Sequence, residues 1–518
     1  GSAKEKAVQF YRSCMDTQQI ESQGAQPLKD LLNQFGGWNI TDMGKANDFN
    51  QTLQTLMARY STFPFFRVHV GPSPFDLKTN IIQIDHPEFE MPPESELKEK
   101  NYLEVTYHKG KKTYRRRDLL ELSPGSEWSV SMGYAITPLQ ERQQRGMLFF
   151  RTTIGELQEK APAIDWLSCL QAVFHPMPMN LSQPIVVHDM DYLTAMSQLI
   201  KQWHKKRVLH IYMIICLIGN LSPAFDSRFQ DVRLELSKIL YGKMGSRMIP
   251  SERWKKCLTD TSSFFEPVLG QMFVQETFPL QTKKLAEQMF SEIQNALYHQ
   301  LDQLEWMDEQ TRQEAKALIS KLQVEIGYPA HILQTAKVNL EYQNLEINEE
   351  TFLLNVVACL KILRENSYLK PLQHHSQDNW RVSPWTVQSY YSIRHHTVVF
   401  PAGMFRSPFF HAEFPSAMNF GAIGVFMAHE LLHSFYGYVL PGGCLTCNRS
   451  TLQKSIDCLV QHYESYDLKV NGTFTLLENT ADTGGLSIAY QAYKNWLKKH
   501  KEEKELPEIE LSHDQLFY

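Results

Sequence analysis

The string His429-Glu430-Leu431-Leu432-His433 lies within an apolar segment, residues 421–436, whose pattern predicts a helix. On a helix, two residues four apart lie ~40° from each other around the axis, so both imidazoles can converge on one ion. Glu430 would then lie on the open side of that ion, where its carboxylate can take a proton from a bound water. The string therefore predicts a metal-dependent hydrolytic site, and a catalytic lobe built around this helix.

The same string also arises by chance, in about one chain in twenty of this length and composition. The alternative is a helix whose histidines only pack or form hydrogen bonds. A third ligand would separate the two interpretations. A histidine soon after the string would need glycine at 436 and histidine at 439, where the sequence has Tyr436 and Val439. The remaining candidate is Glu478, which follows His433 by 45 residues.

Glu478 and Asp482 are four apart in a second segment with helical pattern, residues 475–498. One of these carboxylates can bind a metal while the other accepts the N–H of a ligand histidine and fixes its tautomer. Gly484 and Gly485 would let this helix lie close to a neighbouring helix. The alternative is a solvated acidic helix face.

The segments before the metal-binding string predict a hairpin and a long helical region. Residues 387–392 and 397–400 are β-rich runs on either side of a short turn. The first run is a candidate sheet edge, along which a peptidase can hold its substrate as an added strand. Most of the preceding 350 residues have helical pattern. The clearest helix there begins after Asp308, a good N-cap, and we expect it to continue to the Gly-Tyr-Pro at 327–329.

Composition excludes several classes of protein. The 518 residues include 52 Lys and Arg against 57 Asp and Glu, for a formal charge of −5, so we do not expect a nucleic-acid binder. The 43 % hydrophobic content is that of a folded chain. The longest apolar run, residues 208–221, is too short to span a bilayer, so it predicts a buried helix, and we expect any membrane anchor to lie outside this chain.

Asn-X-Ser/Thr sequons favour an extracellular protein. Chance would give roughly two or three of them in a chain of this size, whereas the sequence has six. The candidate glycosylation sites are Asn39, Asn50, Asn180, Asn220, Asn448 and Asn471.

Taken together, these strings resemble the neprilysin family of zinc metallopeptidases. The resemblance implies a mainly α fold with a small β component (α+β). It also implies a bilobed ectodomain in which a thermolysin-like zinc lobe, expected at 351–518, is covered by a larger helical lobe, expected at about 1–350. The matching pieces are residues 11–14, 82–87, 163–166, 306–308, 326–329, 399–403, 408–410, 429–433 and 478–486.

The resemblance implies one Zn²⁺ per chain, held by His429, His433 and Glu478. It assigns Glu430 as the catalytic base and Asp482 as the residue that orients His429. The implied activity is that of a cell-surface zinc endopeptidase that cleaves small peptides or hormone precursors such as big endothelins.

Two features depart from the family pattern. The strand that binds substrate usually reads Asn-Ala before an aromatic pair, and here it reads Gln388-Ser389; the extra methylene of Gln388 would require a rearranged side chain. The family also places a transition-state histidine and a substrate-binding arginine in a segment beyond residue 518, so we expect this chain to lack that segment. The altered pair leaves a second interpretation open, a catalytically weak or inactive ectodomain that serves as partner or scaffold of a membrane protein complex.

The resemblance also implies a disulfide between Cys14 and Cys257. Cys458 matches a family cysteine whose partner lies beyond residue 518. Cys444 and Cys447 form a C-x-x-C that we interpret as structural. The pairing of the remaining cysteines, Cys169, Cys216 and Cys359, stays open.

Residues 435–436 and 440–445 match one cell-surface member of the family in particular. That match implies a single-pass type II membrane protein with an extracellular peptidase domain. It further implies a disulfide to the XK membrane protein, formed by a cysteine near the membrane that lies outside this chain.

Overall fold

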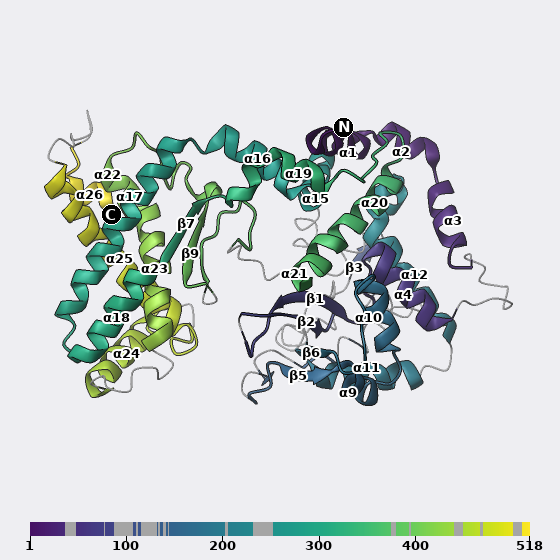
Figure 1. The fold of residues 1–518 in the computed structure, drawn as a ribbon, viewed down its shortest axis with the longest axis horizontal. Coiled ribbons are helices and arrows are strands. Elements are labelled where there is room, and N and C mark those ends of the chain that lie inside the picture. The colour runs from purple at the N-terminus through teal and green to yellow at the C-terminus, as the bar shows by residue number, and fades with distance from the viewer. Residues whose placement is uncertain are drawn as a thin grey trace. The chain divides into compact units, whose positions relative to one another are not determined.

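The fold is mainly helical, and the described residues form three small sheets (Figure 1). This confirms the mainly α fold with a small β component. The chain divides into two compact units, each built from two stretches: residues 1–265 with 339–376, and residues 266–338 with 377–518. The lobe boundary near residue 350 stays a prediction. The computed structural model describes residues 1–36, 48–76, 78–87, 107–109, 112–114, 132, 135–137, 141–142, 145–202, 206–231, 252–373, 380–392, 395–439, 449–466, 470–500 and 510–518.

The first unit contains a four-stranded sheet with helices packed around it. Its strand order is β1-β2-β6-β5, in which β2 and β6 are parallel and the outer pairs are antiparallel. The strands are β1 (Arg67–Pro72), β2 (Asn80–Asp85), β5 (Phe150–Thr153) and β6 (Pro184–Val187), with a separate hairpin of β3 (Tyr107–Lys109) and β4 (Lys112–Tyr114). Its helices are α1 (Ala3–Met15), α2 (Thr17–Gln23), α3 (Gln26–Asn33), α4 (Phe49–Tyr60), α9 (Ile154–Lys160), α10 (Trp166–Phe174), α11 (Met190–Gln202), α12 (Lys206–Leu221), α15 (Arg253–Phe264), α20 (Phe352–Arg364) and α21 (Lys370–Gln373), and α19 (Thr335–Glu341) crosses the boundary between the units.

The apolar run at 208–221 forms most of α12, as predicted. Leu209, Met213, Leu217 and Leu221 recur every four residues on this helix, and all four are buried. The run is therefore explained by packing against the core. Among the helices of the described segments, none has both the length and the apolar character required to cross a lipid bilayer.

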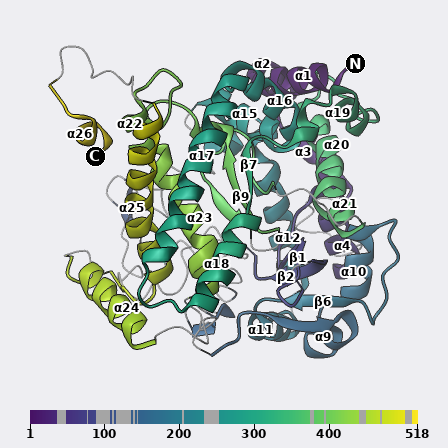
Figure 2. The same cartoon turned by 60° about the vertical axis from the view of Figure 1, so that its left-hand side comes forward.

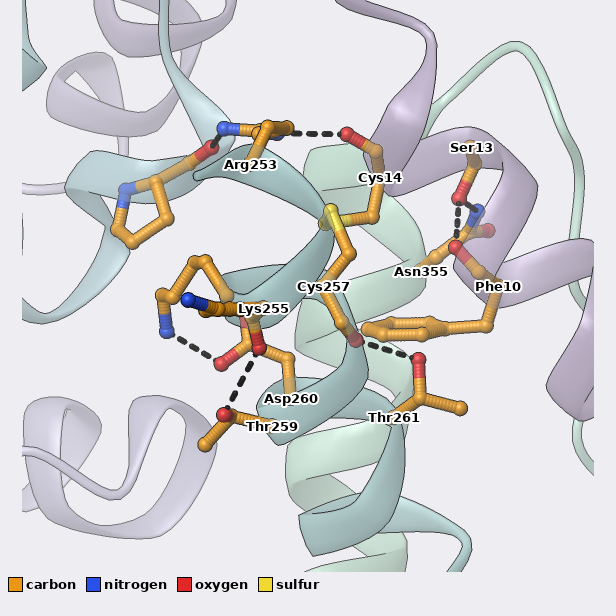
Figure 3. The surroundings of a disulfide bond; sticks show 12 residues. Phe10, Ser13, Cys14, Arg253, Lys255, Cys257, Thr259, Asp260, Thr261 and Asn355 are labelled. Carbon is orange, nitrogen blue, oxygen red and sulfur yellow. Dashed lines mark hydrogen bonds and ion pairs between the residues drawn. A yellow bond between two sulfur atoms is a disulfide. The ribbon is translucent and has the colours of Figure 1, made fainter. Parts of the chain in front are cut away.

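A disulfide joins Cys14 on α1 to Cys257 on α15, as predicted, with the two Cα atoms 5.6 Å apart (Figure 3). Arg253, one turn before Cys257, donates from Nε to the carbonyl oxygen of Cys14 at 2.8 Å. The ring of Phe10, one turn before Cys14, is fully buried beside it. The bridge thus connects two segments 243 residues apart within the core of the first unit.

The second unit contains the predicted metal-binding helix and the predicted hairpin. Its sheet has the order β7-β9-β8, with β7 and β9 parallel and β8 antiparallel to β9. Among the described strands, β8 is therefore an edge strand, and its antiparallel pairing with β9 is that of the predicted hairpin. The elements are α16 (Glu266–Thr277), α17 (Leu280–Gln300), α18 (Glu309–Lys321), β7 (Gln323–Gly327), β8 (Tyr390–Ser392), β9 (Thr397–Pro401), α22 (Ser416–Gly421), α23 (Ile423–Val439), α24 (Arg449–Glu464), α25 (Leu476–Lys499) and α26 (His513–Phe517).

One predicted boundary in this unit is wrong. Asp308 does cap α18, accepting the N–H of Thr311 at 2.7 Å, but the helix ends at Lys321. The next residues form β7, whose five residues pair in parallel with β9. The local pattern predicts a helix up to residue 327 because it contains no information about the pairing of these residues with a distant strand.

Helices α17, α23 and α25 run alongside one another and enclose the core of the second unit (Figure 2). The side chains of Leu431, Phe435 and Ile488 belong to this core. One face of α23 is consequently buried, and its other face carries the polar string.

Candidate metal centre

The polar residues of α23 occupy one face of a helix whose other face is in the core. Ala428, Leu431 and Leu432 are at most 1 % exposed. His429 and His433, which lie one turn apart, are partly exposed instead, with 17 % and 19 % of their side-chain surface accessible. The apolar residues fix the rotation of the helix, and so they decide which way the two imidazoles point.

The two imidazoles and the carboxylate of Glu478 converge. The Nε2 atoms of His429 and His433 lie 2.9 Å apart, and Oε2 of Glu478 lies 3.2 Å from each of them. These are three electron-pair donors from two helices, within 4.8 Å of one another. Two histidines and one carboxylate form a donor set typical of catalytic zinc, so the residues present fit that ion.

Asp482 lies one turn after Glu478 on α25 and contacts the far side of the His429 ring. Its Oδ1 atom is 2.8 Å from Nδ1 of His429. A hydrogen bond from Nδ1–H to this carboxylate leaves the Nε2 lone pair directed at Glu478 and His433. This contact is the one expected of a residue that orients the His429 ring, and that role of Asp482 stays a prediction.

Gly485 allows α25 to approach α23 closely enough for this geometry. A β-carbon at position 485 would lie 3.1 Å from the backbone nitrogen of His429 and 3.3 Å from the carbonyl oxygen of Val425. Both neighbours are backbone atoms, which cannot move away independently. The close approach predicted from Gly484 and Gly485 is thus observed at the level of the metal-binding string.

Glu430 is buried beside the histidines, with 8 % of its surface exposed. Burial raises the pKa of its carboxyl above the ordinary value, while a hydrogen bond from Ser389 and the two neighbouring histidines act in the opposite direction. The hydroxyl of Ser389 donates to Oε1 of Glu430 at 2.7 Å. No sequence pattern predicts this contact, because the two residues are 41 positions apart in the chain.

The other predicted site residues are dispersed over the chain. Gln388 is exposed next to β8, and its predicted role in substrate binding, like that of Ser389, stays a prediction. Cys169 and Cys359 are buried thiols outside any disulfide, and Cys458 is an exposed one. Cys444 and Cys447 lie outside the described residues.

The sequons differ in what their asparagines contact. Asn180 and Asn471 are exposed and precede short turns. Asn50 accepts the backbone N–H of Asp165 at 3.0 Å, and the Asn220 side-chain amide donates to Thr62 at 3.0 Å. Asn220 is exposed as well, whereas Asn50 is only partly exposed, so Asn180, Asn220 and Asn471 are the exposed candidates among the described residues. Asn39 and Asn448 lie outside the described residues.

Two histidines one turn apart, a glutamate from a second helix and a buried carboxylate beside the first histidine define the site of a zinc-dependent peptidase. Sequence comparison gives the same class. The chain matches the profile of Peptidase family M13 over residues 1–329 and again over residues 388–518. The chain therefore belongs to peptidase family M13 and is a zinc metalloendopeptidase, which confirms the resemblance to the neprilysin family.

Individual relatives agree with this assignment. The chain is 43 % identical over 534 residues to the Kell blood group glycoprotein of Homo sapiens, with 100 % of this chain and 73 % of that protein covered. It is 34 % identical over 543 residues to endothelin-converting enzyme 1 of Rattus norvegicus, covering 100 % of this chain and 70 % of that enzyme.

Solved structures share the fold. The zinc metalloprotease of Mycobacterium tuberculosis in its open state has a TM-score of 0.75 at 21 % identity, covering 100 % of this chain and 81 % of that one. PepO of Lactobacillus rhamnosis has a TM-score of 0.75 at 16 % identity, with coverage of 100 % and 80 %.

Proposed function

We propose that this M13 peptidase cleaves small peptides or peptide-hormone precursors, such as big endothelins, at the cell surface. The observation that carries the proposal is the convergence of His429, His433 and Glu478 beside the buried carboxylate of Glu430. The substrate class is supported by the relatives, one of which is named an endothelin-converting enzyme.

The proposed roles follow from the position of each side chain. His429, His433 and Glu478 hold one Zn²⁺ per chain. When bound, that ion lowers the pKa of a water ligand to about 7 and polarises the scissile carbonyl. Glu430 accepts the proton that the attacking water loses and passes it to the leaving amine. Asp482 holds the Nδ1–H of His429, so that Nε2 stays unprotonated and available as a ligand.

The edge strand β8 is the proposed site for the substrate backbone. An extended peptide can add to this edge, since β9 occupies only the other side of β8. Gln388 and Ser389 precede the strand and are proposed to contact the peptide, Gln388 with its exposed side-chain amide and Ser389 with its backbone. The side-chain hydroxyl of Ser389 is already engaged with Glu430.

We further propose that the peptidase domain is extracellular and belongs to a single-pass type II membrane glycoprotein. The sequons support glycosylation, with Asn180, Asn220 and Asn471 the exposed candidates among the described residues. The 43 % identity to the Kell glycoprotein supports a disulfide to the XK membrane protein through a cysteine outside these residues.

The second candidate function is a scaffold with weak or no catalysis. It is favoured by Gln388-Ser389, where the family pattern has Asn-Ala. In that case the domain would keep its partner and lose efficient turnover.

One set of measurements tests both candidates in the full-length protein. We expect about one zinc per chain, and cleavage of a quenched fluorescent big-endothelin peptide. Glu430→Gln should keep the zinc and lose at least about 10³-fold in kcat, because the general base is removed. Glu287→Gln, at an exposed glutamate on α17, is the matched control and should behave as wild type.

The outcomes separate the candidates. Zinc near one equivalent with turnover lost only in Glu430→Gln supports the peptidase. Equal turnover in wild type and Glu430→Gln contradicts the role of Glu430. Bound zinc without turnover in wild type, together with XK linkage that is unchanged in Glu430→Gln, favours the scaffold.

A further inference from the structure

The contact between Ser389 and Glu430 lies at the reaction site and involves a residue outside the metal ligands. The Ser389 hydroxyl donates to Oε1 of Glu430 at 2.7 Å, and both residues are 8 % exposed. A short hydrogen bond between two buried side chains, with a carboxylate as acceptor, belongs to the stronger class of hydrogen bonds in proteins. The contact is therefore strong enough to restrict how the carboxylate rotates.

The orientation of the Glu430 carboxylate matters because this group rotates easily about its terminal bond. The terminal torsion of glutamate is broad and roughly two-fold, so both oxygens exchange places easily when nothing holds them. A general base needs one particular oxygen within hydrogen-bond reach of the proton that it accepts. When a donor is fixed on Oε1, Oε2 is the oxygen that remains available to accept the proton.

The structure also holds the donor in place. Tyr391, two residues after Ser389, contacts Nδ1 of His396 with its hydroxyl at 2.9 Å, and Nε2 of the same ring lies 2.7 Å from the carbonyl oxygen of Leu318 on α18. The hydroxyl of Tyr390 accepts the backbone N–H of Arg381 at 2.7 Å. The side chains of Tyr390 and Tyr391 thus hold β8 in place, and Ser389, the residue immediately before this strand, is held next to α23.

We propose that Ser389 is a positioning residue for Glu430: its hydroxyl holds Oε1, so that Oε2 is the oxygen that exchanges a proton during peptide hydrolysis. The proposal rests on the proposed role of Glu430 as base. It assigns the Ser389 side chain to the base and leaves only its backbone for the substrate. The family pattern has alanine at this position, which offers no hydroxyl, so the contact is a departure with a direct chemical consequence.

A purely structural role predicts different kinetics. If the Ser389 hydroxyl only stabilised the packing of β8 against α23, its removal would destabilise the protein or displace β8. The effect would then appear in KM or in the unfolding midpoint. A positioning role acts on the chemical step and appears in kcat.

The test compares three proteins in their full-length, zinc-loaded form. Ser389→Ala should lower kcat about tenfold, with KM within about twofold of wild type, as expected for loss of one hydrogen bond to a charged group. Ser389→Thr keeps a hydroxyl and should restore most of kcat. An unchanged kcat in Ser389→Ala overturns the proposal. So does a threonine variant that unfolds like wild type but turns over like the alanine variant.

A second readout is independent of activity. A double-mutant cycle of Ser389→Ala and Glu430→Ala is measured as denaturant midpoints of the zinc-free protein. We expect Ser389→Ala to shift the midpoint in wild type and much less in the Glu430→Ala background. Equal shifts in both backgrounds overturn the proposal. Full turnover in Glu430→Gln would contradict the assignment of Glu430 as the base. Full turnover in Ser389→Ala, with turnover lost in Glu430→Gln, would contradict only the positioning role of Ser389.

Discussion

Gly485 on α25 lies directly against the backbone of His429 on α23: a β-carbon at position 485 would be 3.1 Å from the His429 nitrogen and 3.3 Å from its Cα. The adjacent Gly484 has a different neighbour. The nearest neighbour of a β-carbon there would be Cδ1 of Leu432, at 2.7 Å, which is the end of a side chain. Two neighbouring glycines therefore differ in how much the metal centre depends on them.

Replacing Gly485 by alanine should weaken zinc binding by at least about tenfold. The new methyl group meets backbone that cannot yield, so α25 must move and carry Glu478 with it. Gly484→Ala is the matched control and should stay within about threefold of wild type, because the Leu432 side chain can change rotamer. Zinc affinity is measured by competition with a chelating dye. Equal affinities in the two variants would contradict the importance of this helix contact.

Asp482→Ala should lower zinc affinity by about 10–100-fold, although Asp482 is not itself a predicted ligand. Without the carboxylate 2.8 Å from Nδ1, the His429 ring is free to rotate and to carry its proton on Nε2. The control is Asp514→Ala, which removes an exposed ion pair with Lys494 elsewhere in the unit. The same chelator competition gives the answer, and wild-type affinity in Asp482→Ala would exclude an orienting role.

Much of the centre follows from spacing along single helices. His429 and His433, and likewise Glu478 and Asp482, are four apart, so helix geometry alone places each pair on one face. That Glu478 belongs with the histidines required one further assumption, the packing of two helices. The hairpin carrying Ser389 was also recognisable, from β-rich runs on either side of a turn.

The features that the sequence does not predict depend on contacts between segments far apart in the chain. The Ser389 hydroxyl reaches Glu430 only because β8 pairs with β9 and lies next to α23. The early end of α18 has the same cause, since β7 exists by pairing with β9. Residues 339–376 belong to the first unit through contacts such as that of the Tyr342 hydroxyl with the Phe264 carbonyl at 2.9 Å. Local sequence patterns do not indicate which distant segments will pack against each other.

Loss of the Cys14–Cys257 disulfide should destabilise the first unit and leave zinc affinity unchanged. The bridge closes a separation of 243 residues, for which the chain-entropy model gives about 5 kcal/mol. All proposed zinc ligands belong to the second unit. The double variant Cys14→Ser/Cys257→Ser should lower the thermal unfolding midpoint by several degrees, whereas Cys458→Ser, at an exposed thiol, should not. Reduced zinc affinity in the double variant would contradict this separation.

The sheet of the first unit carries two histidines that share one acceptor. Nε2 of His69 on β1 and Nε2 of His188 after β6 lie 3.1 Å and 2.7 Å from Oε1 of Gln83 on β2. The Gln83 amide nitrogen donates to the carbonyl oxygen of Pro72 at 2.9 Å, which turns Oε1 towards both rings. Each neutral ring can donate its N–H to this oxygen, and the ring centroids are 5.6 Å apart.

The surroundings of this pair disfavour its protonation. Burial lowers the pKa of His69, and the neighbouring His188 and Arg67 lower it further, while the Gln83 hydrogen bond and Asp85 act in the opposite direction. Burial likewise lowers the pKa of His188, to which Arg142, Arg67 and His86 add, while Asp85 opposes them. The folded protein therefore keeps both rings neutral at a pH where the unfolded chain already binds protons.

Acid should consequently destabilise the first unit. An unfolded histidine titrates near 6.5, so the stability from these rings is complete above about pH 6.5 and declines as pH falls towards their lower folded pKa values. Between pH 7 and pH 5, the unfolding midpoint of the zinc-free wild type should fall by several degrees more than that of His69→Gln/His188→Gln, whose side chains do not titrate. His175→Gln, at an exposed histidine of the same unit, should retain the wild-type pH dependence. Parallel curves for wild type and the double variant would show that the charge on these two rings does not control the acid response.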